Sequence, residues 1–246
     1  MNDNCMLAFL NALKENNTKE WMSANKSWQK EANADFEKLL CRILSELSAA
    51  GCPMSGGHDV KDFIMRYARD TRFSHDKSPY HASLRAHLSP AGRLPIPVGF
   101  YIHLEPGNSF LGGGLFASQF KDATSMIRNH IVSHGEQWEA ILREPAFAEK
   151  FVLIGEKLKN VPREYDAALS VSEYLKHKSW AIEYPVSDEE LDHAEFFAQN
   201  AAAVFLLMRP FNDFLNQALR AFICRSADES PSGVKPQLFL IRVLPG

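Results

Sequence analysis

The spacing of hydrophobic residues changes several times along the chain, and it is helical at the start. From Met6 to Leu13 the apolar positions recur at helical spacing, which predicts a first helix. Asn17 and Glu20 have the spacing of a capping box, so we expect a second helix to begin there and to carry an apolar stripe from Trp21 to Leu47. A helical N-terminal part is therefore expected over residues 5–50.

Alternation of apolar and polar residues replaces the helical spacing in the next part of the chain. Such alternation is typical of strands that bury one face. It occurs over residues 62–68, 81–88 and 98–105, and a turn at residues 105–108 leads into a further expected strand over residues 109–116. The later strands are joined by short connections, which favours an antiparallel meander because parallel strands need long crossovers. We predict a sheet core over residues 60–117.

Helical spacing returns in the C-terminal half. The expected elements are helices over residues 118–134 and 136–142, a strand at the end of residues 174–186, a helical C-terminal part over residues 187–224, and a final strand over residues 237–243. Ser187 and Glu190 have the spacing of a second capping box, which is expected to begin a helix. Pro210 is expected to break or kink that helix. The whole pattern predicts a single α+β domain over residues 1–246, an antiparallel β-meander sheet with helices packed on one face.

Aromatic residues are concentrated in the C-terminal helical part. They are Phe196, Phe197, Phe205, Phe211 and Phe214. A stripe of this kind belongs to the core or to the face of a homodimer, because both bury the same side chains. A homo-oligomer therefore stays open as an interpretation.

Composition excludes several classes of protein. The chain has 246 residues, of which 46% are hydrophobic and 23% charged, the balance of an ordinary globular protein. Its net charge of −3 argues against a general binder of nucleic acid. The apolar run from Ala201 to Met208 is too short to span a membrane, and the N-terminus lacks the basic region of a signal peptide. Four scattered cysteines indicate reduced thiols, so we expect a cytoplasmic protein without a membrane partner.

Positive charge is concentrated in one segment, from Arg66 to His81, between two predicted strands. Guanidinium groups offer donors in a fixed fork that suits phosphate and carboxylate, and long loops on a rigid sheet often carry function. We predict a site for a small anionic ligand, lined by Arg66, Arg69, Arg72, Ser74, Lys77, Tyr80, Tyr101 and Arg128. The candidate catalytic acids and bases are Asp70, Asp76, His103 and Glu105. The alternative is an ion-pair network in which the aspartates hold the arginines and the loop is only structural.

The polar faces of the following strands form a second feature. Side chains alternate with period two, so neighbouring strands would bring their polar residues to one surface. These residues are His81, Ser83, Arg85 and His87 on one strand, and Tyr101, His103 and Glu105 on the other. No metal site is predicted, and the residues that come nearest to one are His81, His87, His103 and Glu105. The simpler alternative is a solvated polar face, and the sequence predicts no particular cofactor.

Several segments resemble one known family. The segment RYARDTRFSHDKSPYHASL closely resembles the signature of a bacterial and fungal family, domain of unknown function 2461, whose members typically read R-x-x-RDTRFSKDKxPYKTH. The resemblance extends over most of the chain, through LNALKENNTKEWMSANK, YIHLEPGNSFLGGGLF, MIRNHI, PREYD and YLKHKSW. It implies membership of that family, and it implies no particular reaction.

A few positions depart from the family pattern. The lysine that usually follows RDTRFS is His75 here, the lysine after Pro-Tyr is His81, and Ala168-Leu169-Ser170 replaces the usual Asp-His-Pro. If the lost side chains serve a site in the family, this member differs at that site.

Three functions follow from these observations. The first is binding of, or action on, a small anion at the basic loop, and the second is a non-catalytic protein-interaction module. The third, a local contact with nucleic acid, is opposed by the net charge. A pocket walled by Arg69, Arg72 and Lys77 would favour the first, and saturation of those side chains by aspartates or carbonyls would count against it.

Overall fold

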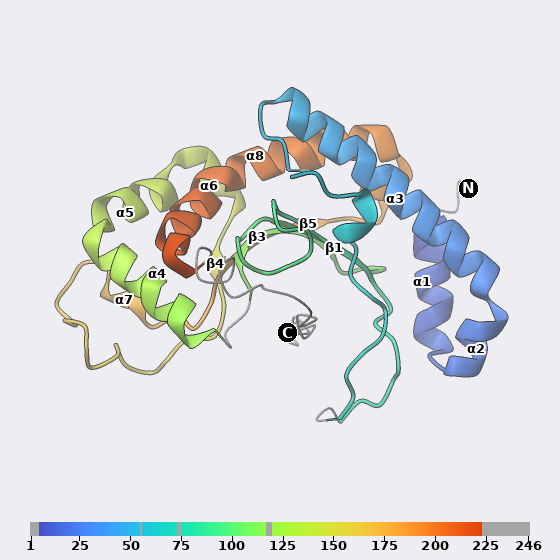
Figure 1. Cartoon of the computed structure of the whole chain (residues 1–246), viewed down its shortest axis with the longest axis horizontal. Coiled ribbons are helices and arrows are strands. Elements are labelled where there is room, and N and C mark those ends of the chain that lie inside the picture. Colours follow the sequence, from blue (N-terminus) through green and yellow to red (C-terminus); the bar gives the residue numbers. More distant parts are fainter. Residues whose placement is uncertain (1–4, 55, 73–74, 117–119, 223–246) are drawn as a thin grey trace. The chain divides into compact units, whose positions relative to one another are not determined.

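The computed structural model describes residues 5–54, 56–72, 75–116 and 120–222 (Figure 1). The fold is α+β as predicted, with one antiparallel sheet in the order β1-β2-β3-β5-β4. The strands are β1 (Leu84–Leu88), β2 (Phe100–Leu104), β3 (Ser109–Leu115), β4 (Leu153–Ile154) and β5 (Trp180–Val186). The chain forms two compact units, the first with residues 1–94, 100–112 and 184–206 and the second with residues 95–99, 113–183 and 207–246. The expectation of a single domain stays a prediction.

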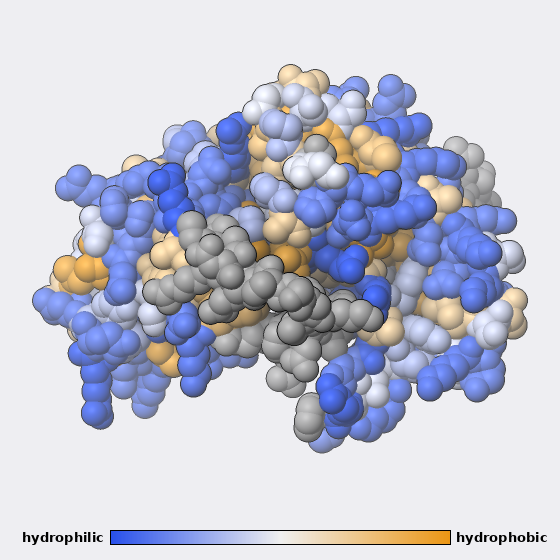
Figure 2. Space-filling view, in the orientation of Figure 1, coloured by the Kyte–Doolittle hydropathy of each residue, from blue (hydrophilic) through white to orange (hydrophobic). Residues whose placement is uncertain are grey.

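The first unit begins with three helices, α1 (Cys5–Glu15), α2 (Lys19–Ala24) and α3 (Lys26–Ala49). α1 packs on α3 through buried residues that include Phe9, Leu10 and Leu13, and the outer surface of these helices is mostly hydrophilic (Figure 2). The prediction of one continuous second helix is wrong. Asn25 ends α2, and its side-chain amide donates to the Trp21 carbonyl at 2.9 Å, which competes with continuation of the helix.

The start of α2 also differs from the predicted capping box. Thr18 is the N-cap, and its hydroxyl accepts from the Trp21 amide at 3.2 Å. Asn17 instead binds the chain at Tyr80. Its side-chain amide donates to the Tyr80 carbonyl at 2.9 Å, and its side-chain oxygen accepts from the Tyr80 amide at 3.1 Å. Asn17 thus supplies the donor and the acceptor that a neighbouring strand would offer.

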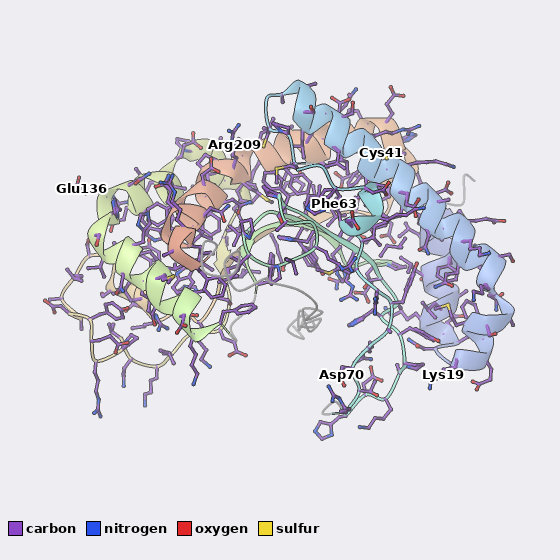
Figure 3. All side chains as sticks on the ribbon, viewed as in Figure 1. Lys19, Cys41, Phe63, Asp70, Glu136 and Arg209 are labelled. Atoms are coloured by element: carbon purple, nitrogen blue, oxygen red, sulfur yellow. The ribbon has the colours of Figure 1, made fainter. Side chains whose placement is uncertain are left out.

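A long connection leads from α3 to β1. It begins with the short helix η1 (Val60–Asp62), and residues 63–72 and 75–83 then form an extended segment, here named the arm. Figure 1 shows the arm projecting beyond β1, and Figure 3 places Phe63 near α3 and Asp70 far out along the arm. The arm therefore holds the segment in which the sequence concentrates positive charge.

The prediction of a regular strand over residues 62–68 is wrong. The bridges found there are isolated ones, Ile64 with Ala86 and Ala68 with Tyr80. Between these bridges, the Arg66 carbonyl accepts a hydrogen bond from the Arg85 side chain at 2.8 Å. A side chain therefore takes an acceptor that a regular ladder would need.

β1 and β2 are antiparallel neighbours. In their register, Leu84 lies opposite Leu104, Arg85 opposite His103 and His87 opposite Tyr101. On the apolar face, Phe100 stacks on Phe205 of α8 (Ala194–Ala218), with the ring centroids 4.7 Å apart. The other face is buried too, since Arg85, His87 and His103 are each 3% exposed. The alternative of a solvated polar face is therefore wrong for these residues.

The second unit contains α4 (Lys121–Ser133), α5 (Gly135–Arg143), α6 (Pro145–Lys150), α7 (Ser172–Leu175) and the C-terminal half of α8. Trp138 of α5 is fully buried, and its ring lies 5.0 Å from that of Phe214 of α8. Asn212 of α8 accepts from the Gly114 amide at 2.7 Å and donates to the Gly99 carbonyl at 2.9 Å. These two bonds attach α8 to the glycine-rich strand β3.

α8 begins later than the sequence predicts. Ser187 and Glu190 do make capping-box contacts, with the Ser187 amide donating to the Glu190 carboxylate at 2.8 Å. These contacts lie at the start of the short helix η2 (Glu189–Asp192), which contains Glu190, and the long helix begins only at Ala194. The final strand predicted over residues 237–243 lies outside the described residues.

Pro210 lies inside α8 without ending it, contrary to the predicted break. Met208 and Phe211 on either side of it are fully buried, and their packing holds the helix across the missing hydrogen bond. The aromatic stripe is mostly core, as predicted, but Phe196 is 68% exposed. No helix in the described parts of the chain is long and apolar enough to cross a membrane.

Candidate functional site

Three cations of the arm have partners within the arm. Arg69 pairs with Asp76, Arg72 with Asp70, and Lys77 donates to the Thr71 carbonyl. Arg72 binds its partner with two nitrogens, Nε at 2.9 Å from Oδ1 and Nη2 at 2.6 Å from Oδ2 of Asp70. For Arg69 and Arg72 the arrangement has the form of the ion-pair network, in which each guanidinium charge already has a carboxylate partner.

The same contacts keep both aspartates ionised. The side chain of Arg72 lowers the pKa of Asp70 to about 2. Hydrogen bonds from Ser78 and Arg69 lower the pKa of Asp76. A carboxylate with so low a pKa is a poor proton acceptor at neutral pH, which argues against Asp70 and Asp76 as general bases.

Three other residues of the arm were candidate ligand contacts. The Arg66 guanidinium is exposed and has no ion pair or hydrogen bond within the described part of the chain, although its carbonyl binds Arg85. Tyr80 is fixed through its main chain by Asn17. Ser74 lies outside the described residues. Of the basic segment, Arg66 and Lys77 therefore have no carboxylate partner among the residues described, and Lys77 is bound to a main-chain carbonyl.

Chemically active side chains gather on the polar face of β1 and β2, at the base of the arm. We name His81, Arg85, Tyr101, His103 and Glu105 the polar-face cluster. Arg85 lies directly opposite His103, so their Cβ atoms are cross-strand neighbours. The centroids of the Tyr101 and His103 rings lie 6.3 Å apart. Tyr101 also interacts with the guanidinium of Arg85 and favours its charged form. The sequence placed these residues on one face, and the register confirms it for Arg85, Tyr101 and His103.

Three nitrogens of this cluster are buried without a hydrogen-bond partner among the described residues. They are Nε2 of His81, Nε of Arg85 and Nδ1 of His103. Buried polar atoms in folded proteins nearly always have a partner, so a group of three at one place calls for an explanation. Bound ligands, ions and water are the usual ones.

Burial sets the charges of the cluster. Burial, with the positive charges of Arg85 and Arg69, lowers the pKa of His81 to about 3, so its imidazole is neutral at physiological pH. Burial also lowers the pKa of Arg85, and Tyr101 opposes that change. The ordinary pKa of a guanidinium is so high that Arg85 keeps its charge. The cluster therefore offers the buried cation of Arg85 beside the neutral ring of His81.

Glu105, which directly follows β2, fixes the ring of His103. Nε2 of His103 lies 3.0 Å from Oε2 of Glu105, and this contact lowers the pKa of the Glu105 carboxyl. Lys14 of α1 approaches the other carboxylate oxygen at 3.9 Å. The His103 ring stacks on Phe110, with centroids 4.8 Å apart. The predicted pair of His103 and Glu105 thus exists as a hydrogen-bonded dyad.

Arg128, a predicted ligand contact, serves the packing of the second unit. Its Nε donates to the Leu175 carbonyl and its Nη2 to the His177 carbonyl, both at 2.8 Å. The guanidinium also lies 6.0 Å from the ring centre of Trp180. The side chain is 8% exposed. These main-chain contacts engage its Nε and Nη2 atoms.

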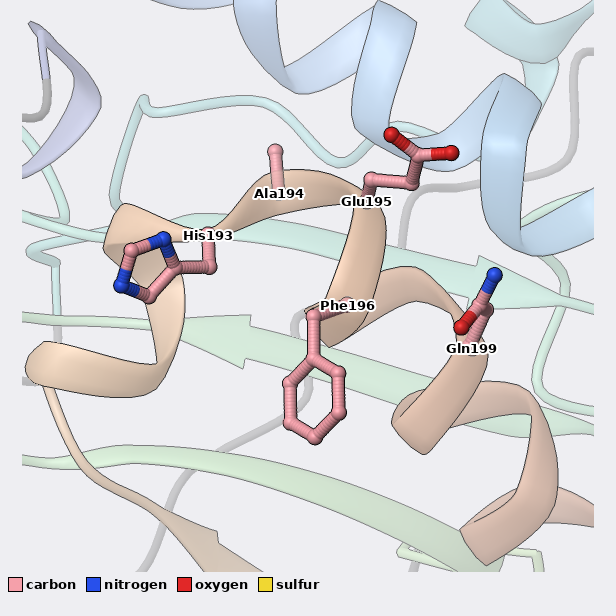
Figure 4. Close-up of a pocket in the computed structure, with 5 residues that line it drawn as sticks. All are labelled: His193, Ala194, Glu195, Phe196 and Gln199. Atoms are coloured by element: carbon pink, nitrogen blue, oxygen red, sulfur yellow. The ribbon is translucent and has the colours of Figure 1, made fainter.

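Two other features bear on ligand binding. Within the described ranges, no group of three or more His, Cys, Asp or Glu side chains is arranged to hold a metal ion. His87 is engaged with main-chain groups of Gly92 and Leu94. An open hollow lies at the start of α8, lined by His193, Ala194, Glu195, Phe196 and Gln199 (Figure 4). It contains none of the predicted site residues.

Sequence reasoning missed Arg85 as a binding residue. Its signal was present, because Arg85 occupies a polar position in an alternating strand. Its importance depends on the register that sets it opposite His103, and on the burial of both. Neither can be read from the pattern of one strand.

Comparison with known proteins identifies a family. The family described as conserved hypothetical protein (DUF2461) matches residues 5–214, and the chain belongs to it. Searches of curated proteins and of solved structures found no match. The match covers α1, the arm, the polar-face cluster and most of α8.

Proposed function

We propose that the chain binds a small oxyanion, a phosphate or a carboxylate, on the polar face of β1 and β2 at the base of the arm. The observation that carries the proposal is the group of three buried nitrogens in His81, Arg85 and His103 that lack partners among the described residues. A buried polar group without a partner costs about 1–3 kcal/mol. An oxyanion beside Arg85 would remove part of that cost and would neutralise a buried cation.

In this proposal the arm is a frame rather than the binding surface. Its ion pairs hold Arg69 and Arg72 in place, and the uncompensated charge of Arg66 adds attraction for an anion. The same pairing leaves little for a phosphate backbone, so nucleic acid is not proposed as a partner. The proposed setting is the cytoplasm, where free thiols such as those of Cys5, Cys41 and Cys52 persist.

Thermal unfolding of the full chain tests this proposal. Phosphate, sulfate and simple carboxylates are added at constant ionic strength, and at least one is expected to raise Tm, because a ligand of the folded state stabilises it. Arg85→Met keeps the apolar stem without the charge and should abolish the shift. Arg72→Met, the matched change in the arm, should retain it.

Loss of the shift in Arg72→Met but not in Arg85→Met would place the ligand in the arm. If none of the anions changes Tm, the proposal is contradicted. If Arg85→Met does not fold, Arg85→Lys replaces it. That variant keeps a cation and removes Nε, so a weakened shift is expected.

A second candidate is a non-catalytic interaction module, and the exposed ring of Phe196 favours it. In that case the arm is a structural network, and a second copy of the chain covers Phe196. Sedimentation of the wild type should then show a dimer that Phe196→Asp dissociates without a change in unfolding. A monomer at all concentrations would exclude this candidate.

A further inference from the structure

His103 presents an acceptor to the proposed site, and this restricts the ligand. We infer that His103 accepts a hydrogen bond from the bound anion, so that the ligand is an oxyanion with its own O–H group. Hydrogen phosphate, the monoanion of a phosphate monoester and a hydroxy acid are members of this class. The inference rests on the proposed function and narrows its ligand.

The partner of His103 determines which ring nitrogen carries the hydrogen. Nε2 lies 3.0 Å from Oε2 of Glu105, whose carboxyl is further held by Asn108 at 3.3 Å and by Lys14 at 3.9 Å. These contacts keep the carboxylate ionised, and an ionised carboxylate can only accept hydrogen bonds. Nε2 must therefore donate, and in a ring that carries a single N–H hydrogen the lone pair is on Nδ1.

The ring is held so that its nitrogens cannot exchange places. His103 is 3% exposed, and its plane lies within 10° of that of Phe110. A flip of the ring would break the hydrogen bond to Glu105. Nδ1 is buried and has no hydrogen-bond partner among the residues that the structure describes. It is a fixed acceptor inside the polar-face cluster.

Arg85 supplies the complementary donor across the strand pair. Its Nη2 is engaged with the Arg66 carbonyl at 2.8 Å, and its Nε is one of the buried atoms without a described partner. A guanidinium only donates, and Nδ1 of His103 accepts in this inference. A ligand that contacts both residues therefore needs an acceptor for Arg85 and a donor for His103. Sulfate at neutral pH has acceptors only and would set an oxygen lone pair against Nδ1. Hydrogen phosphate offers both groups.

The test compares ligands that differ in an O–H group. Isothermal titration calorimetry on the full chain, near neutral pH and at constant ionic strength, pairs phosphate with sulfate and malate with succinate. The O–H member of each pair is expected to bind about tenfold or more tightly, since it satisfies one additional buried acceptor.

Glu105→Gln tests the origin of this preference. The amide of glutamine can donate as well as accept, so it permits the other form of the His103 ring, and the preference should shrink. His75→Gln, a change at an exposed position of the arm, should leave the preference unchanged.

Nitrogen-15 NMR of the wild type gives a readout that needs no variant. Nδ1 of His103 should be unprotonated and Nε2 protonated, and the Nδ1 signal should move when phosphate is added. A protonated Nδ1, in a ring with one hydrogen or with two, would overturn the inference. So would equal binding within both pairs that Arg85→Met abolishes, and that result would leave the proposed function standing. If neither pair binds, both fall.

Discussion

Asn17 attaches two distant parts of the first unit with one side chain. It binds both main-chain groups of Tyr80, and it lies in the turn between α1 and α2. Its neighbour Asn16 makes only a local contact, from its side-chain amide to the Ala12 carbonyl at 3.0 Å. Adjacent residues of the same type therefore have different structural roles.

Replacing each asparagine with alanine separates these roles. Asn17→Ala leaves the Tyr80 amide and carbonyl without their partner, and we expect a loss of about 1–2 kcal/mol in the free energy of unfolding. Asn16→Ala removes an exposed local bond and should change it by less than about 0.5 kcal/mol. Urea denaturation measures both, and equal losses would contradict this account.

Gly114 lies where the packing leaves no room for a side chain. Its φ is +93°, and a Cβ would lie 2.2 Å from the Trp180 carbonyl oxygen and 2.8 Å from the Phe211 ring. Gly107 has a similar φ of +73° but nothing within 4 Å of a Cβ. Both positions have a positive φ, which favours glycine, but only at Gly114 do neighbouring atoms occupy the place of a Cβ.

Gly114→Ala combines backbone strain with overpacking, so we expect a loss of about 3 kcal/mol or more in the free energy of unfolding. Gly107→Ala carries the strain alone and should cost about 1–2 kcal/mol. Denaturation curves of the two variants test the difference. A Gly114→Ala variant as stable as Gly107→Ala would show that β3 can move away from Trp180.

At the scale of elements, charged side chains hold the outer part of the arm, beyond the main-chain hydrogen bonds from Arg69 to Pro79 at 2.9 Å and from His81 to Tyr67 at 2.7 Å. Asp76 accepts from the Ser78 amide at 2.9 Å and from the Ser78 hydroxyl at 2.7 Å, in addition to its pair with Arg69. Because Asp76 is exposed, these contacts shape the arm locally and contribute little to global stability.

Asp76→Asn should therefore loosen the arm without a change in the unfolding midpoint. Trypsin cleavage after Arg72 or Lys77 is expected to become several-fold faster, because the backbone of the arm opens locally more often and exposes these peptide bonds to the protease. Asp35→Asn breaks a comparable exposed pair with Lys38 in α3 and serves as the control. Limited proteolysis with mass spectrometry gives the rates, and an unchanged rate would count against the frame.

The sequence predicts elements well where one periodicity persists. Alternation places β1 and β2 within a few residues of their bounds, and the turn at residues 105–108 does the same for β3. It fails over residues 62–68, where side-chain bonds replace a ladder, and at Asn25, where a polar side chain ends a helix inside a continuous apolar stripe. Local hydrogen bonds of single residues decide both cases, and hydrophobic spacing does not record them.

The candidate site was predicted only in part, because the sequence pattern records the spacing of residues and not their contacts. Period-two alternation correctly puts His103 and Glu105 on one face. Charge clustering points to Arg69 and Arg72, which the structure finds paired to aspartates. The sequence cannot show which cations are compensated, because that depends on contacts across turns and strands.

At the scale of the whole molecule, buried histidines couple stability to pH. Burial lowers the pKa of His87 and of His177 to about 4, and that of His81 to about 3. An unfolded histidine titrates near 6.5. Between about pH 6.5 and 4 the unfolded chain thus binds protons that the folded chain does not, and stability rises with pH across this window.

We expect acidification from pH 6 to pH 5 to lower the free energy of unfolding by about 1 kcal/mol or more. His87→Gln should make this pH dependence shallower, while His75→Gln at an exposed position should not. Urea denaturation at several pH values measures the slope. A slope unaffected by His87→Gln would mean that His87 titrates normally in the folded protein.

The bond between Asn17 and Tyr80 also bears on the order of folding. The two residues are 63 positions apart, whereas α1, α2 and α3 contact one another over short stretches of chain. Closing a loop of that length is entropically costly, so local helix pairing should precede it on the folding pathway. The attachment of the arm would then form after the rate-limiting barrier, and its loss would accelerate unfolding while leaving the folding rate nearly unchanged.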